Sequence, residues 1–126
     1  INNDELNSYL GKRFEMLIRE NFLSFFKNFE DNGKWWYKDK EIDILAVNNK
    51  EKSILFGECK WREKVNVFEI VKILLEKSKY VAWNNDKRKE SFVVFAKSFN
   101  KKIKEFEGKK VYCFDLKDIE DILEKR

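Results

Sequence analysis

The stretch "EIDILAVNNKEKSILFGECKW", residues 41–61, decides the fold because it contains two strand-like runs around a short polar loop. The runs, residues 42–48 and 53–61, are rich in Ile, Leu, Val and Phe, which is typical of buried strands. A loop over residues 49–52 would join them as an antiparallel hairpin. Three charged residues, Asp43, Glu58 and Lys60, interrupt these otherwise apolar runs and need an explanation.

The expected hairpin places the charged residues side by side. With that loop, counting back along both strands puts Asp43 opposite Glu58, and Glu41 opposite Lys60. Directly opposed residues share a face, with Cβ atoms about 4.5–5.5 Å apart. Two carboxylates in an apolar setting repel unless one is protonated or a cation lies between them. The pairing therefore predicts a divalent-metal site open to a phosphate, and a one-residue change in register would remove it.

A purely structural interpretation of the same residues is also open. Lys60 could bridge Glu41 and Glu58 as a surface ion pair, with Asp43 solvated at the start of its strand. The two interpretations differ in whether Asp43 is buried beside Glu58.

A further acid, Glu15, falls within the apolar arc of a helix expected over residues 3–28, capped by Asn3 or Asp4. Gly11, one turn earlier on the same side, would leave room above its carboxylate. Either Glu15 belongs to the site, or it pairs with Arg19 one turn later.

The rest of the chain reads as alternating strands and helices. Asn66 and Glu69 resemble a capping box. The expected elements after the first helix are a strand at 34–38, the hairpin, a helix at 66–83, a strand at 91–97, a short helix at 100–106, a strand at 110–116 and a helix at 117–126. Short turns make the first three strands an antiparallel meander, and helices connect the later strands. This order predicts an α/β fold with a mixed central sheet flanked by helices on both faces.

Composition limits the class of protein. The 126 residues fit one domain, and the net charge of +4 is compatible with a polyanionic partner. Two cysteines without any histidine are too few for a zinc site, and they indicate reduced thiols in a cytoplasmic protein. No apolar run approaches membrane-spanning length. The Lys- and Glu-rich, His-free composition fits a thermophile, and the basic group at residues 87–89 reads as a solvated loop.

The charged residues of the hairpin resemble a known signature. Asp43 followed by Glu58-Cys59-Lys60 resembles the D…ExK motif of the PD-(D/E)XK, or restriction endonuclease-like, nucleases, and Glu15 is similar to the helical glutamate of many members. Their αβββαβ core has the element order expected here. Ile42 stands where the family name has Pro, a position that varies among these nucleases.

A narrower resemblance comes from "YLGKRFEMLIRE", "GKWWYKDKEIDILAV" and "LFGECKW". These segments are similar to the uncharacterised C-terminal domain of archaeal P-loop ATPases. The resemblance implies that an N-terminal ATPase domain precedes this single nuclease-like domain, residues 1–126, in a longer chain. The chain itself has no Gly-x-x-x-x-Gly-Lys-Ser/Thr run for nucleotide binding.

The nuclease resemblance implies roles for particular residues. Asp43 and Glu58 would hold Mg²⁺ or Mn²⁺ together with the backbone carbonyl of Cys59. Lys60 would orient the attacking water or neutralise charge on the phosphate, and Glu15 would bind a second metal or position its waters. The substrate would be nucleic acid, with DNA expected. The Cys59 side chain would point to the opposite face of the strand and pack in the core.

Two rival interpretations belong to other functional classes. The domain could be a nuclease-fold module that binds DNA or a partner protein for the attached ATPase without cleaving it. It could also form a homodimer through its tryptophans, which are enriched at interfaces, although core and rim packing is the favoured explanation of them. The four are Trp35, Trp36, Trp61 and Trp83.

Overall fold

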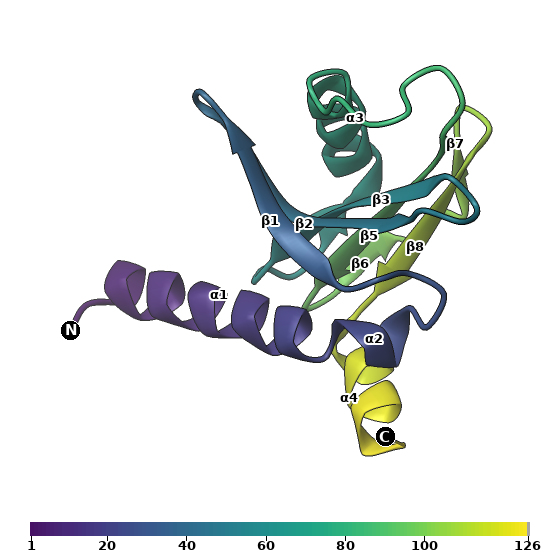
Figure 1. The fold of residues 1–126 in the computed structure, drawn as a ribbon. Helices are drawn as coiled ribbons and strands as arrows, with labels where there is room; N and C mark the ends of the chain where they lie inside the picture. The colour runs from purple at the N-terminus through teal and green to yellow at the C-terminus, as the bar shows by residue number, and fades with distance from the viewer. Residues whose placement is uncertain (126) are drawn as a thin grey trace.

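The computed structural model describes residues 1–125 and has an αβββαβ core (Figure 1). Its main helices and strands are α1 (Asn3–Glu20), β1 (Asn32–Tyr37), β2 (Lys40–Asn48), β3 (Ser53–Lys60), α3 (Val67–Ser78), β5 (Lys89–Ala96), β8 (Lys109–Phe114) and α4 (Leu116–Glu124). Short elements are inserted between them: α2 (Phe22–Phe25), β4 (Val65–Asn66), β6 (Phe99–Lys101) and β7 (Glu105–Phe106). The predicted α/β class and element order of the core are confirmed.

The central sheet is mixed, as predicted. Six strands lie in the order β1-β2-β3-β5-β8-β7. The first three form an antiparallel meander, whereas β3, β5 and β8 are parallel and β7 is antiparallel. The β2–β3 hairpin has the expected register, since Asn48 pairs with Ser53 and Leu45 with Phe56.

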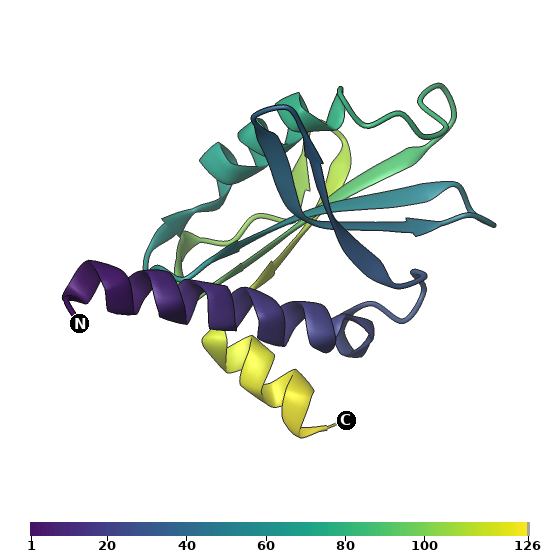
Figure 2. The ribbon, with the colours of Figure 1, turned by 60° about the vertical axis from the view of Figure 1, so that its left-hand side comes forward.

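Helices cover both faces of the sheet, and each face carries its own apolar core (Figures 1 and 2). Helix α3 packs on one face, where the buried side chains include Ile42, Ile54, Phe56, Val71, Leu74, Phe92 and Val94. Helices α1, α2 and α4 pack on the other face, where they include Phe14, Ile18, Phe22, Phe26, Ile44, Leu55, Phe95 and Ile119. This three-layer arrangement leaves the strand ends as the places where polar groups can gather.

Helix α1 is shorter than the sequence predicted. It begins after Asn2, whose side chain accepts from the Glu5 N–H, and it ends at Glu20 rather than near residue 28. Asn21 leaves the helical conformation, and its side chain donates to the Leu17 carbonyl. This break redirects α2, so that Phe22 and Phe26 enter the core beneath the sheet instead of continuing along one stripe.

One further predicted boundary and one predicted helix are wrong. Asn66 caps α3 by accepting from the Glu69 N–H, but the helix ends at Ser78 instead of near residue 83. The predicted helix at 100–106 is absent, and β6 and β7 occupy that segment. β6 pairs in parallel with β4, and β7 pairs with the start of β8, so pairing with distant strands overrides a weak local helical preference.

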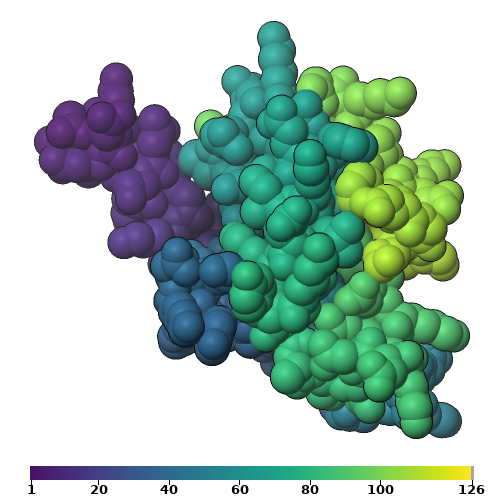
Figure 3. Space-filling model, turned by 90° about the horizontal axis from the view of Figure 1, so that it is seen from above, coloured from purple at the N-terminus to yellow at the C-terminus, as the bar shows by residue number. Residues whose placement is uncertain are grey.

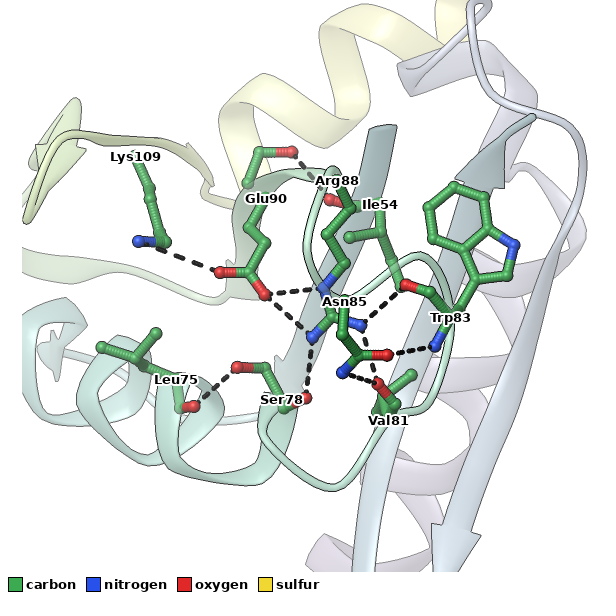
Figure 4. A network of polar contacts seen from close by, with 10 residues as sticks. Ile54, Leu75, Ser78, Val81, Trp83, Asn85, Arg88, Glu90 and Lys109 are labelled. Atoms are coloured by element: carbon green, nitrogen blue, oxygen red, sulfur yellow. Dashed lines mark hydrogen bonds and ion pairs between the residues drawn. The ribbon is translucent and has the colours of Figure 1, made fainter. Parts of the chain in front are cut away.

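The early end of α3 is explained by Arg88, whose side chain is almost fully buried (Figure 4). Its guanidinium donates to the carbonyls of Ser78, Val81 and Trp83, and it pairs with Glu90 at 2.9 Å. The bond to Ser78 supports the last carbonyl of α3, and the bonds to Val81 and Trp83 hold the segment that follows the helix. The prediction of a solvated loop is therefore wrong for Arg88, although its neighbour Lys87 is exposed.

Three of the four tryptophans pack against the two apolar cores. Trp35 and Trp83 pack against the core on the α3 side, Trp61 packs against the other core, and Trp36 is 66% exposed. Among residues 1–125, no helix has the length and apolar character that crossing a membrane requires.

Candidate functional site

A β-bulge in strand β2 positions Asp43. Gly33 pairs with Leu45 but Trp35 pairs with Ile42, so β2 has one more residue than β1 across this interval. The interval on β2 contains Asp43 and Ile44. Bulges bend strands and redirect side chains, and beyond this point the β1–β2 hairpin curves away from β3 toward α3 (Figure 1).

The Asp43 side chain lies where β2 separates from β3. The regular register of the hairpin ends at Ile44 opposite Gly57. Beyond it, the Cys59 N–H donates to Asp43 Oδ2 at 3.0 Å, so the carboxylate takes the place of a strand carbonyl. Asp43 is 5% exposed. The alternative in which Asp43 is solvated at a strand start is therefore wrong.

Gly57 permits the close strand contact beside the site. A Cβ at this position would lie 2.7 Å from Val93 Cγ1 and 3.0 Å from Ile44 Cβ. Only glycine fits these distances without movement of the neighbours. The residue thus fixes the spacing of β2, β3 and β5 immediately before Glu58.

Asp43 and Glu58 are adjacent, and their interaction alters the acidity of Glu58. Burial is the main cause that raises the pKa of Glu58 from 4.5 to about 7. The negative charge of Asp43 and a hydrogen bond between the two carboxyl groups raise the pKa further, while the positive charges of Lys60 and Lys77 oppose the shift. The site therefore holds two acids with too little positive charge to ionise both easily.

Lys60 is the nearest counterion on the same strand. Its Nζ lies 3.4 Å from Glu58 Oε2, and its side chain is 33% exposed whereas that of Glu58 is 14% exposed. The ammonium group therefore lies between the buried acids and solvent. The alternative in which Lys60 also bridges to Glu41 is not observed, because Glu41 pairs with Lys34 at 3.6 Å.

The carboxylate of Glu15 pairs with basic residues and does not join Asp43 and Glu58. It forms the predicted alternative, an ion pair with Arg19, and its Oε2 also lies 3.5 Å from Lys34 Nζ. Arg19 in turn donates to the backbone carbonyl of Asp43. Glu15 thus influences the bulge through Arg19, while Gly11 lies against Trp61.

Cys59 packs away from the two acids, as predicted. Its side chain contacts the core on the α1 side of the sheet. Burial raises the pKa of the Cys59 thiol well above its usual range, and the charges of Asp43 and Glu58 add to the effect. The thiol stays protonated near neutral pH, so only the backbone carbonyl of Cys59 is suited to a hard metal ion.

Of three basic residues around the site, the sequence identified only Arg19, as a partner of Glu15. Arg19 and Lys34 surround Glu15, and Lys77 reaches from α3 to donate to the Glu41 carbonyl at 2.8 Å. The spacing of Glu15 and Arg19 on one helix was a usable signal. Nothing in the sequence connects Lys77 to the hairpin, because the two meet only through the packing of α3.

The donor set fits a hard divalent cation. Among residues 1–125, no three His, Cys, Asp or Glu side chains lie in an arrangement that could hold a metal ion, so Glu15 does not join the pair. Mg²⁺, however, commonly binds through one or two carboxylates and completes its shell with water and phosphate. The adjacent Asp43 and Glu58 carboxyl groups meet that requirement, since burial and then the charge of Asp43 raise the Glu58 pKa and a cation would relieve both.

Comparison with known proteins places the chain in a family. Residues 1–73 match DUF234, described as archaea bacterial proteins of unknown function. The chain belongs to this family. The DUF234 match extends from α1 into α3 and includes Glu15, Asp43, Glu58 and Lys60. Every candidate site residue therefore lies within the part that the family shares.

One curated relative extends the match beyond that segment. The chain is 32% identical over 122 residues to an uncharacterized protein of Methanocaldococcus jannaschii. The matched segment covers 90% of this chain and 26% of the relative. The chain thus spans about a quarter of the relative's length. No solved structure matches.

Proposed function

We propose that this domain is a Mg²⁺- or Mn²⁺-dependent nuclease of the PD-(D/E)XK type that hydrolyses phosphodiesters of nucleic acid, with DNA as the expected substrate. The observation that carries the proposal is the adjacency of Asp43 and Glu58 beside Lys60. A buried pair of acids next to a partly exposed ammonium group is better suited to binding a metal ion and a phosphate than to stabilising a sheet.

Each residue has a distinct task in this proposal. Asp43 and Glu58 hold the metal through their carboxylates, with the Cys59 carbonyl as a further donor. The bound metal would supply Lewis acidity and lower the pKa of a coordinated water. Lys60 places its ammonium where a phosphate approaches from solvent and stabilises the negative charge that develops there.

Arg19 and Gly57 position the pair. Arg19 fixes the bulge by donating to the Asp43 carbonyl, and the same guanidinium is oriented by Glu15. Gly57 keeps β2 and β3 close enough for the two carboxyl groups to meet. Glu15 would therefore act as a positioning residue rather than as a ligand.

The test is cleavage of a panel of labelled single-stranded, double-stranded and branched DNA and of RNA, with Mn²⁺, Mg²⁺ or EDTA. We expect metal-dependent cleavage of at least one substrate, with loss of activity in Asp43→Ala, Glu58→Ala and Lys60→Ala. The exposed loop variants Glu51→Ala and Lys50→Ala are matched controls for charge. Equal activity in wild type and the site variants, or no cleavage in any condition, would refute the catalytic proposal.

A binding module without catalysis is the second candidate. The ion pair of Glu58 with Lys60 and the engagement of Glu15 by Arg19 and Lys34 favour it, because protein groups already neutralise much of the acidic charge. This candidate predicts nucleic-acid or protein binding that Asp43→Ala leaves intact, together with the absence of stabilisation by Mn²⁺ in a thermal unfolding experiment.

We also propose that the domain serves an ATPase in the same polypeptide. The relative from M. jannaschii is much longer than the matched segment, which leaves most of its chain for other domains. Cleavage by a full-length relative should then respond to ATP, and cleavage by the isolated domain should not. An identical response in both would contradict this arrangement.

A further inference from the structure

A second surface adjoins the candidate site and has a different chemistry. The tip of the β1–β2 hairpin lies beside α3, where the blue and teal segments meet in Figure 3. Two large aromatic side chains are exposed there, Tyr37 (45%) and Tyr80 (51%), whereas Trp36 (66%) points to the opposite side of the hairpin because side chains alternate along β1. We call this the hairpin–α3 face, and its aromatic rings are not absorbed by either core.

The rings of this face are held in a defined arrangement. Tyr37 from the hairpin and Tyr80 from the turn after α3 stack with centroids 6.1 Å apart and ring planes 26° apart. Lys40 Nζ lies 4.6 Å from the centre of the Tyr80 ring, and Lys38 Nζ lies 5.3 Å from that of Tyr37. Each ring is thus paired with an ammonium group, while much of its surface stays open to solvent.

The charge around these rings is mainly positive. Two open hollows, of about 410 and 400 Å³, adjoin the hairpin tip, one beside Trp36 and the other beside Tyr80. Their charged lining residues comprise five lysines, Lys34, Lys38, Lys40, Lys72 and Lys77, and three acids, Asp39, Glu41 and Glu76. Lysines that border exposed aromatic rings suit a ligand with both anionic and planar groups.

The face leads directly to the acid pair. Lys77 donates to the Glu41 carbonyl on the hairpin, and Lys34 pairs with both Glu41 and Glu15. The same bulge that separates β2 from β3 at Asp43 also bends the hairpin over α3. A polymer lying on the face can therefore extend to Asp43 and Glu58 along continuous protein surface.

We propose that the hairpin–α3 face binds a single-stranded segment of nucleic acid, with unpaired bases stacked on the Tyr37–Tyr80 pair and with phosphates contacting the lysines. This inference builds on the proposed function, since it names the form of substrate for the same site. Every base has a face that can stack on an aromatic ring. In a duplex those faces are covered by neighbouring base pairs, so rings at a surface favour unpaired strands.

The test separates binding from cleavage by working in EDTA. Fluorescence anisotropy would measure the affinity of the wild type for a labelled oligothymidine of roughly 15 nucleotides and for a duplex of the same length. The variants are Tyr80→Ala and Tyr37→Ala. Tyr9→Ala on α1 is the matched control, because Tyr9 is also 51% exposed but lies away from this face.

We expect preferential binding of the single strand, and a loss of about 5- to 150-fold in affinity for each face variant but not for Tyr9→Ala. Circular dichroism would confirm that the variants fold, and Lys40→Gln provides a further variant that leaves the rings in place and should reduce the salt dependence of binding. Equal affinity for single strand and duplex, or equal affinity in Tyr80→Ala, Tyr37→Ala and wild type, would overturn the proposal.

The result of the binding experiment can be interpreted independently of the cleavage experiment. If the face variants lose affinity for the oligothymidine in EDTA but the wild type does not cleave it with Mn²⁺, the face is correct and the catalytic proposal fails. If the wild type cleaves and the face variants retain both affinity and rate, the catalytic proposal stands and the face is wrong. Capture of a second copy or of a protein instead of the oligonucleotide would likewise refute the assignment.

Discussion

Replacing Glu58 with Gln should stabilise the metal-free protein at alkaline pH. The pKa of Glu58 rises from 4.5 to about 7 on folding, chiefly because its carboxyl group is buried and then because Asp43 is close. The folded protein therefore binds more protons than the unfolded chain between these pH values. The free energy of unfolding falls as pH rises through this window and reaches its full loss above pH 7.

The magnitude follows from the same pKa values. The difference between 4.5 and about 7, at about 1.4 kcal/mol per pKa unit, is roughly 3 kcal/mol. Glutamine cannot ionise, and its amide can donate to Asp43 as protonated Glu58 does. Loss of the half-exposed ion pair with Lys60 subtracts at most about 1 kcal/mol. Glu58→Gln should therefore gain about 2–3 kcal/mol relative to wild type near pH 8.5 and little near pH 4.

The assay is urea unfolding of wild type and Glu58→Gln in EDTA, followed by tryptophan fluorescence at several pH values between about 4 and 8.5. Glu51→Gln in the exposed hairpin loop is the control for removal of a negative charge. A stability difference that stays constant with pH, or a variant that is less stable at every pH, would refute the burial of the Glu58 carboxyl group beside Asp43.

Two further substitutions test the packing that positions the site. Gly57→Ala should cost about 1–3 kcal/mol in urea unfolding, because the new Cβ would lie 2.7 Å from Val93 Cγ1; an unchanged stability would show that the strands can separate there freely. Arg88→Ala should cost about 3–5 kcal/mol, because it leaves Glu90 and several carbonyls without their buried donor, whereas exposed Lys87→Ala should be neutral within about 0.5 kcal/mol. Equal effects of the two substitutions would argue against the network in Figure 4.

The hairpin could be predicted because its information is local. A loop at residues 49–52 sets the register from Asn48 opposite Ser53 to Ile44 opposite Gly57, and this register brings Asp43 near Glu58; the apolar pattern alone does not fix it, because both faces of the hairpin are apolar. The Asn66 cap is similarly local. The bulge at Asp43 was not predicted, since no Gly or Pro marks it and its donor, Arg19, belongs to a different element.

The errors share a physical origin in distant packing. The end of α1 depends on where Phe22 and Phe26 meet the sheet, and the end of α3 depends on a guanidinium ten residues further along the chain. The segment 100–106 forms short strands because β4 and β8 provide partners. Local helix and strand propensities do not include these distant contacts. The sequence therefore predicts most of the element types correctly but misplaces several of their boundaries.

Calorimetric titration with Mn²⁺ tests the central claim most directly, namely that Asp43 and Glu58 together hold a divalent cation. At pH 7 about half of the Glu58 carboxyl groups carry a proton in the metal-free protein, given a pKa of about 7. Binding should therefore release about half a proton per ion, which buffers of different ionisation enthalpy would reveal. We predict one site in wild type and none in Asp43→Asn. Equal binding by both proteins, or no binding by the wild type, would contradict the account.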